Sequence, residues 1–304
     1  MQLYIHFLGT GGSWPSVQRN VSAVSIKRGG EVLLFDCGEG TQRQIQRSSI
    51  SYMQIRKVFI THYHGDHFLG LPGFIQTMQL NDREEALHIY GPKGTEEIVD
   101  TILHLGHFSP SYPVIGHDLK SGDVVKCDGY EVRCVAARHN VPCLAYSLVE
   151  DVRPGKFNKP MALELGVPEG PLFRKLQQGK SVEVNGKIIT PDMVLGPPRP
   201  GRKITISGDT MPCKRVIELA RGSDVLIHDA TFDSSLEDRA NEYGHSTARQ
   251  AAEVAKEAGV EKLYLTHISP RYRDAEELEM EAREVFPASY VAHDFMEIEV
   301  RLKK

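Results

Sequence analysis

The sequence lacks the features that mark several broad protein classes. No apolar run in its 304 residues is long enough to cross a bilayer, and it begins without the basic segment and cleavage site of a secretion signal. Its five cysteines are scattered and form no Cys-x-x-Cys pair, which argues against a disulfide framework and a zinc knuckle. These absences predict a cytoplasmic protein with no membrane partner.

A strong excess of positive charge is also absent. The net charge of −4 argues against a protein that coats nucleic acid, although it leaves room for a local basic surface. The hydrophobic fraction of 40% and the charged fraction of 25% are ordinary for a soluble globular chain, and this length can form one or two domains with a sizeable core.

Strand-like and helix-like segments alternate along most of the chain, which predicts the α/β class. Helices are expected at 68–80, 95–105 and 246–258, with Gly259 ending the last one. The glycine-rich segment 9–12 is followed by neither a helix nor a phosphate-binding lysine, so we expect a flexible loop beside a site. Strands are expected at 3–8, 22–27, 32–35, 58–60, 87–90, 130–136, 203–207, 225–228 and 262–266.

Residues 150–202 interrupt this alternation and are rich in proline and glycine. Between Arg153 and Lys180, six basic residues stand against two acidic ones, an excess opposite in sign to the net charge of the chain. Two interpretations are open: a solvated linker, or a protruding arm that binds a polyanion.

A dense cluster of metal-binding side chains directly follows the apolar run 58–60. It consists of His62, His64, Asp66 and His67. Because α/β sheets place their sites at the carboxyl ends of strands, this position favours a metal site over isolated structural histidines. Imidazole and carboxylate donors favour zinc or another late first-row metal.

Three further candidates, His139, Asp209 and His267, each stand where another predicted strand ends. The set fills two metal sites if Asp209 bridges them, because a carboxylate has two oxygens to share. We assign one metal to His62, His64, His139 and Asp209, and the other to Asp66, His67, Asp209 and His267. Paired metals activate water at neutral pH, which predicts hydrolysis of a phosphodiester, an ester or a lactam.

The motif His62-x-His64-x-Asp66-His67, with the later ligands and the segment 35–40, resembles the signature of the metallo-β-lactamase superfamily. A closer resemblance, over nearly the whole chain, is to the ribonuclease Z family of tRNA 3′-end endonucleases. It rests on the segments 7–11, 35–39, 90–94, 207–210, 228–232, 245–247 and 265–269.

The ribonuclease Z resemblance implies a four-layer αββα metallo-β-lactamase sandwich over residues 1–304, with a flexible tRNA-binding arm inserted at 150–202. It implies two Zn²⁺ per subunit and a homodimer in which one subunit's arm holds precursor tRNA for the other's site. Cleavage 3′ of the discriminator nucleotide would leave a 3′-hydroxyl on the tRNA and a 5′-phosphate on the trailer. Asp36 would orient site loops without binding metal.

Catalytic and substrate-binding roles follow as expectations. Asp66 would both bind the second metal and accept the proton of the attacking water. His245, oriented by Asp229, would donate a proton to the leaving ribose oxygen, although capping of the helix after it is the alternative. Substrate contacts are expected from Arg19 and from the arm residues Arg153, Lys156, Lys159, Gly170, Pro171, Arg174 and Lys175.

Two departures from the family pattern and two rival functions belong to this prediction. The family commonly has glutamate where Asp229 stands, and its Pro-x-Lys-x-Arg-Asn loop has Val17 here in place of lysine. The second departure bears on discrimination against mature CCA ends, not on cleavage. The rivals are a small ester or thioester hydrolase or phosphodiesterase on the same scaffold, and a non-catalytic RNA-binding or metal-storage protein.

Overall fold

The protein, described here by a computed structural model over residues 1–303, contains two compact units. The larger comprises Met1–Cys127, Val132–Leu148 and the chain from Arg202 onward, and the smaller comprises Asp128–Glu131 and Val149–Gly201. Among the described residues, no helix is long and apolar enough to cross a bilayer.

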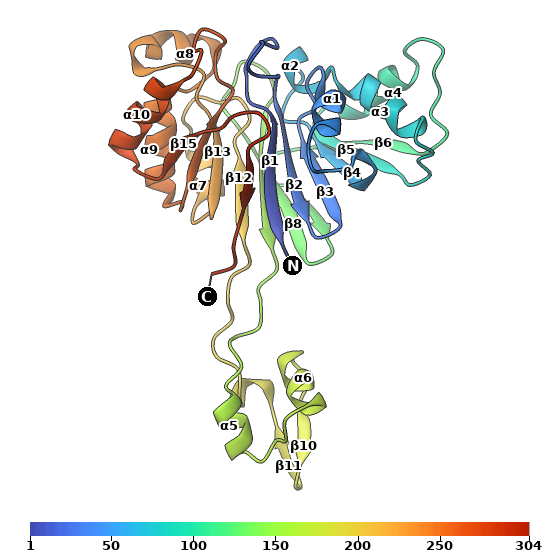
Figure 1. Cartoon of the computed structure of the whole chain (residues 1–304), viewed down its shortest axis with the longest axis vertical. Coiled ribbons are helices and arrows are strands. Elements are labelled where there is room, and N and C mark those ends of the chain that lie inside the picture. The colour runs from blue at the N-terminus through green and yellow to red at the C-terminus, as the bar shows by residue number, and fades with distance from the viewer. Residues whose placement is uncertain (304) are drawn as a thin grey trace. The chain divides into compact units, whose positions relative to one another are not determined.

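The first of two seven-stranded sheets carries the start of the chain (Figure 1). Its strands β16, β1, β2 and β3 pair antiparallel, whereas β3, β4, β5 and β6 pair in parallel. In sheet order they are β16 (Glu297–Glu299), β1 (Leu3–Gly9), β2 (Ala23–Arg28), β3 (Glu31–Phe35), β4 (Ile55–Phe59), β5 (Leu87–Pro92) and β6 (Val114–Leu119).

The second sheet carries most of the remaining strands of the larger unit. Its parallel part runs from β12 to β15. In sheet order its strands are β15 (Ser289–Val291), β14 (Leu263–Thr266), β13 (Val225–Asp229), β12 (Lys203–Ile206), β9 (Leu144–Glu150), β8 (Tyr130–Ala136) and β7 (Val124–Cys127).

The two sheets pack face to face through aromatic side chains and are covered by helices on their outer faces (Figure 1). Phe59 of β4 lies edge-on to Tyr146 of β9 with 5.4 Å between ring centroids, and Phe7 of β1 lies 5.7 Å from Tyr264 of β14. Helices α1 (Thr41–Gln46), α3 (Leu71–Gln79) and α4 (Thr95–Leu103) cover the first sheet, and α7 (Lys214–Ala220), α9 (Ala248–Ala258) and α10 (Glu276–Val285) cover the second. The expected four-layer αββα sandwich is confirmed.

Local chemistry explains where two predicted helices differ from the structure. The helix expected at 246–258 begins at Ala248, because the Thr247 hydroxyl accepts a hydrogen bond from the Gln250 N–H and caps it. The helix expected at 68–80 is two helices, α2 (Gly65–Phe68) and α3, and Pro72 stands in the first turn of the second, where its missing N–H has no cost. Gly259 ends α9 in the left-handed conformation, as expected.

The smaller unit has its own apolar core. It holds helices α5 (Lys159–Glu164) and α6 (Pro171–Gln177), the hairpin of β10 (Val182–Val184) and β11 (Lys187–Ile189), and the short 3-10 helix η2 (Pro191–Met193). Ala162, Val167, Leu176, Val182, Ile189 and Val194 form the buried cluster between them. The remaining elements of the larger unit are α8 (Glu237–Tyr243), η1 (Tyr52–Gln54) and η3 (Ser234–Leu236).

Candidate metal centre

The predicted ligands meet at one edge of the sandwich. His62, Asp209 and His267 follow the ends of β4, β12 and β14, and His139 follows β8. Asp66 and His67 lie in α2, which begins at Gly65 after the loop that follows β4. Since the carboxyl ends of parallel strands share one edge of a sheet, segments 205 positions apart in the sequence contribute to a single cluster.

The first group of donors is formed by His62, His64, His139 and Asp209. His64 Nδ1 lies 3.0 Å from His62 Nε2 and 3.2 Å from His139 Nε2. Asp209 Oδ2 lies 3.5 Å from His62 Nε2. The four atoms therefore surround one small space.

The second group is formed by Asp66, His67 and His267, and it reaches the same oxygen of Asp209. Asp66 Oδ2 lies 3.2 Å from His267 Nε2 and 3.6 Å from His67 Nε2. Asp209 Oδ2 lies 3.3 Å from His67 Nε2 and 3.4 Å from His267 Nε2. A carboxylate oxygen thus stands between both groups, in the position of a bridge.

The imidazoles are oriented through their second nitrogens. Thr61 donates its hydroxyl to Asp36 and accepts from His62 Nδ1 at 3.0 Å, while His67 Nδ1 donates to Asp36 Oδ2 at 2.8 Å. Each of these bonds fixes the tautomer that leaves Nε2 free for the centre. The Asp36 backbone has φ 57°, an unusual left-handed conformation for a non-glycine residue, and its carboxylate also accepts from the Thr61 N–H.

The ligands from the second half of the chain are held in the same way. His139 Nδ1 donates to the Gly244 carbonyl at 2.8 Å. His267 Nδ1 donates at 2.9 Å to the hydroxyl of Thr231, which itself donates to Asp229. A side chain at Gly244 would clash, because its Cβ would lie 2.8 Å from the His139 ring.

The chemistry of these groups fits metal ions. His67 Nε2 is buried and has no hydrogen-bond partner among the described residues, as expected for a nitrogen that faces a cation. Burial alone would raise the pKa of Asp209, but His267, His67 and His62 hold it well below its usual range, so the carboxylate is ionised and able to bind metal. The edge of a zinc–nitrogen tetrahedron is about 3.3 Å, close to the observed donor separations.

His245 and Asp229 form a separate pair beside the metal ligands. His245 Nδ1 donates to Asp229 Oδ2 at 2.9 Å, and Asp229 also accepts from the backbone of Thr210 and Thr231. Burial lowers the pKa of His245, but the Asp229 carboxylate outweighs it and raises this pKa to about 9. His245 Nδ1 lies 3.9 Å from Asp209 Oδ2, which makes it a possible ligand, yet that nitrogen is already engaged by Asp229.

The glycine-rich segment after β1 lies against the second group of donors. A Cβ at Gly12 would stand 2.6 Å from the His267 ring, so only glycine fits there. The Ser13 N–H donates to Asp66 Oδ2 at 2.7 Å. The loop therefore touches the site, as its sequence predicted.

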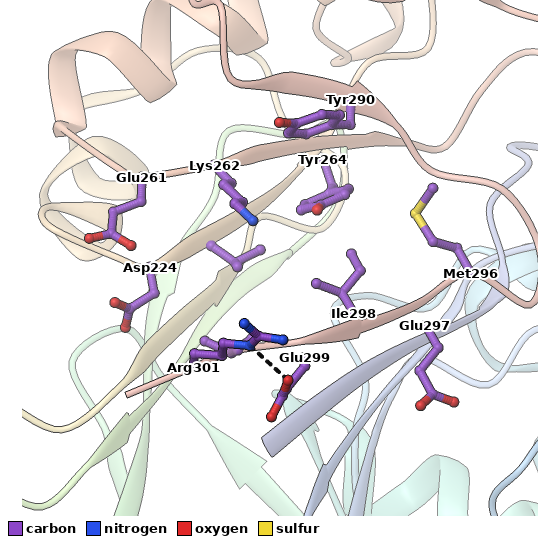
Figure 2. Close-up of a pocket in the computed structure, with 12 residues that line it drawn as sticks. Asp224, Glu261, Lys262, Tyr264, Tyr290, Met296, Glu297, Ile298, Glu299 and Arg301 are labelled. Atoms are coloured by element: carbon purple, nitrogen blue, oxygen red, sulfur yellow. Dashed lines mark hydrogen bonds and ion pairs between the residues drawn. The ribbon is translucent and has the colours of Figure 1, made fainter. Parts of the chain in front are cut away.

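Two hollows of the larger unit differ in their relation to the predicted ligands. A cleft of about 410 Å³ includes His64 and His245 in its walls. A separate groove of about 590 Å³, shown in Figure 2, is lined by residues of β14 and β16 and contains the ion pair between Arg301 Nε and Glu299 at 2.9 Å. None of the proposed ligands lines that groove, whereas His64 lines the cleft.

The expected substrate-binding residues have different environments. Arg19 is 8% exposed and donates to the Thr10 hydroxyl and the Ala292 carbonyl, so it braces the loop and does not present its charge to a ligand. In the smaller unit, Lys159 pairs with Glu169 at 2.7 Å, and Gly170 and Pro171 begin α6. Lys156, Arg174 and Lys175 are exposed, and Arg153 bonds to the Pro200 carbonyl.

Sequence reasoning named Asp36 as an orienting residue but missed the other groups that orient the ligands. The Gly244 carbonyl has no side-chain signal, and it lies 105 positions from the histidine it holds. Thr61 and Thr231 could have been noticed, because each stands directly beside a site motif.

Comparison with known proteins first defines the class. Residues 3–149 match the family model described as anti-Pycsar protein Apyc1, and residues 189–268 match the beta-lactamase superfamily domain. The fold resembles that of the metallo-beta-lactamase fold protein YhfI from Bacillus subtilis, with a TM-score of 0.72 at 18% identity over 98% of this chain and 99% of that one. Fold and ligand pattern thus define a metallo-β-lactamase superfamily protein.

Full-length relatives then define the family. Ribonuclease Z of Methanosarcina acetivorans is 51% identical over 299 residues, 98% of each chain, and that of Myxococcus xanthus is 45% identical over 304 residues, 99% of each. The crystal structure of human tRNase Z, short form, matches with a TM-score of 0.73 at 30% identity, covering 98% of this chain and all of that one. The chain belongs to the ribonuclease Z family.

Proposed function

We propose that this chain is a zinc-dependent endoribonuclease that removes the 3′ trailer from precursor tRNA, leaving a 3′-hydroxyl on the tRNA and a 5′-phosphate on the trailer. The observation that carries the proposal is the position of Asp209 Oδ2 between two groups of imidazole nitrogens, at 3.3–3.5 Å from His67, His267 and His62. Two zinc ions per subunit suit this donor set in number, type and spacing.

His62, His64, His139 and Asp209 would hold one ion, and Asp66, His67, Asp209 and His267 the other. A bound pair of divalent ions lowers the pKa of water and stabilises the attacking and leaving oxygens of a phosphoryl displacement. Asp66 directs Oδ2 at the ligand cluster, and among the described residues its Oδ1 has no hydrogen-bond donor. Oδ1 is therefore the atom that would take the proton of the attacking water.

His245 would donate a proton to the departing ribose 3′-oxygen. Asp229 holds its Nδ1, and His245 lines the cleft beside the ligands, so Nε2 is the nitrogen that would donate the proton. The raised pKa keeps the imidazole protonated near neutral pH, as an acid requires. Asp229 is buried and accepts five hydrogen bonds, one of them from His245. These bonds fix its carboxylate, so aspartate can hold His245 without the extra methylene of glutamate.

The smaller unit, which consists almost entirely of the 150–202 segment, would bind tRNA through phosphate contacts. Its exposed basic residues Lys156, Arg174, Lys175 and Lys180 support this assignment. The subunits would form a homodimer in which each arm serves the partner's active site. Light scattering of the purified protein measures that state directly.

Hydrolysis of a small ester or thioester is not favoured, because relatives at 45–51% identity over the whole chain are ribonucleases Z. The test compares one purified preparation on labelled precursor tRNA, on bis(p-nitrophenyl) phosphate and on a thioester. We expect efficient cleavage of the precursor, slow hydrolysis of the phosphodiester and none of the thioester. Preferred turnover of the thioester would reject the proposal.

A further inference from the structure

The cleft beside the metal ligands has features that the cleavage chemistry itself does not require. Its walls include His64 and His245, so it adjoins one proposed metal ligand and the proposed proton donor. Among its other lining residues are an indole, a phenol and two guanidinium groups: Trp14, Tyr243, Arg239 and Arg271. Aromatic faces and arginine forks in one cleft are the groups that bind unpaired nucleotides.

Trp14 is a large apolar side chain that the fold leaves in solvent. It is 61% exposed, and within the described chain its ring stacks on no other aromatic ring. Its backbone, in contrast, is fixed: the Trp14 N–H donates to the Gly12 carbonyl at 2.9 Å, and the preceding Ser13 N–H donates to Asp66 Oδ2 at 2.7 Å. The indole is therefore presented on a support tied to a metal ligand.

The guanidinium groups of the two cleft arginines lie near aromatic rings. The Arg271 guanidinium lies 5.2 Å from the centroid of Phe232, and that of Arg239 lies 5.8 Å from the centroid of Tyr243. Over residues 1–303, neither forms an ion pair or a side-chain hydrogen bond, whereas Arg249 nearby pairs with Glu284 at 2.6 Å. Their N–H groups are thus available to an incoming phosphate, to which arginine can bond with two parallel N–H groups.

We propose that this cleft binds the nucleotides flanking the scissile phosphate, with Trp14 stacked on one base and Arg271 bonded to an adjoining phosphate. The inference rests on the proposed function and adds a subsite to it. Stacking recognises any base by its π-face, so the subsite fixes the position of the RNA strand across the metals without reading its sequence.

Trp14 is the single tryptophan of the chain, so its fluorescence reports on this position alone. The probe is a precursor tRNA whose scissile phosphate is replaced by a methylphosphonate, titrated into the zinc-loaded protein. We expect the emission to be quenched on binding. An abasic nucleotide immediately 5′ or 3′ of the cut should remove most of the quenching and raise Kd by about fivefold to a hundredfold, the range that base–aromatic stacking supplies.

Variants assign the contacts. Trp14→Ala should raise Kd for the intact analogue by a similar factor and should have no further effect on the abasic analogue, whereas Trp14→Phe should retain most of the affinity. Arg271→Gln should weaken binding and reduce the salt dependence by about one phosphate contact. Arg273→Gln, which removes the same charge two positions away and outside the cleft, should do neither.

The outcomes separate this inference from the proposed function. The subsite would be overturned if precursor cleavage is normal but the Trp14 fluorescence is not quenched on binding. It would also be overturned if Trp14→Ala and each abasic substitution raise Kd independently, so that their effects add. Either result would leave the endonuclease proposal intact. A wild-type protein that neither binds the analogue nor cuts precursor tRNA would overturn both.

Discussion

At the scale of single residues, Asp209 has the widest influence on the site. Its Oδ2 lies within 3.5 Å of three imidazole nitrogens that belong to both groups of donors. His139, in contrast, contributes to one group only. The two residues therefore offer a matched test of the bridge.

Asp209→Ala should reduce zinc from two ions per chain to less than one, because it removes a donor from both sites. His139→Ala should lose the equivalent of one ion. Elemental analysis of folded protein, checked by circular dichroism, measures both. Equal metal content in the two variants would contradict the bridging role.

His245→Ala should slow precursor cleavage by roughly a hundredfold to ten-thousandfold, the usual contribution of a general acid, with both metals retained. Bis(p-nitrophenyl) phosphate should be affected much less, since nitrophenolate departs without a proton. His104→Ala, an exposed histidine far from the ligands in sequence, is the control. A uniform loss on both substrates would argue for a structural role.

The pH profile gives a second readout of the same group. If His245 acts as the proposed acid, precursor cleavage should fall as pH rises through its pKa, which the Asp229 carboxylate raises to about 9. Bound metal cations lower the pKa of His245, so the fall in activity on the alkaline side of the pH profile should occur at or below about pH 9. His245→Ala should lack this fall, and a profile unchanged by this substitution would exclude the proton-donor assignment.

The candidate metal ligands could be predicted at this scale because they are chemically distinctive and stand at strand ends. Among the groups that orient them, Asp36 was expected from the family resemblance, whereas the Gly244 carbonyl and the Thr61 and Thr231 hydroxyls are brought to the ligands only by folding. Arg19 was expected to bind substrate because its loop resembles that of the family, and only the fold reveals that its side chain is buried against Thr10 and Ala292.

At the scale of elements, the smaller unit is the feature with most consequence. Its buried cluster consists entirely of its own residues. Its removal should therefore leave the metal-binding unit folded.

Replacing the segment 149–201 with a short glycine-serine linker should reduce precursor cleavage by at least about a hundredfold, because phosphate contacts supply much of the affinity for nucleic acid. Turnover of bis(p-nitrophenyl) phosphate should persist. A milder variant, with Lys156, Arg174, Lys175 and Lys180 changed to glutamine, keeps the fold and should weaken tRNA binding and its salt dependence. Loss of the small substrate in both variants would assign the arm a structural role instead.

Secondary structure was predictable where apolar strands and capped helices are regular. The strand 130–136 and the end of α9 at Gly259 agree with their sequence signals. Helices α5 and α6 were missed because they span six and seven residues and carry a proline in their first turn, which suggested an interruption. Strands β6 and β7 were missed because their side chains are only partly buried and show no apolar run.

At the scale of the whole molecule, the proposed dimer makes activity depend on residues from two chains. Mixing Asp209→Ala subunits with arm-deleted subunits should restore precursor cleavage, because each mixed dimer pairs an intact centre with the partner's arm. Random exchange predicts roughly a quarter of wild-type activity per subunit, since half of the dimers are mixed and each has one working site. Absence of recovery after verified exchange would show that the arm serves its own subunit.

The central claim is that the clustered ligands form a zinc centre that cuts precursor tRNA at its 3′ end. Its most direct test is end-group mapping of the products formed by the zinc-loaded protein from end-labelled precursor tRNA. The account predicts one cut after the discriminator nucleotide, a 3′-hydroxyl on the tRNA, a 5′-phosphate on the trailer, and loss of both products when the metal is chelated. A 2′,3′-cyclic phosphate on the tRNA, or unchanged cleavage by metal-free protein, would contradict it.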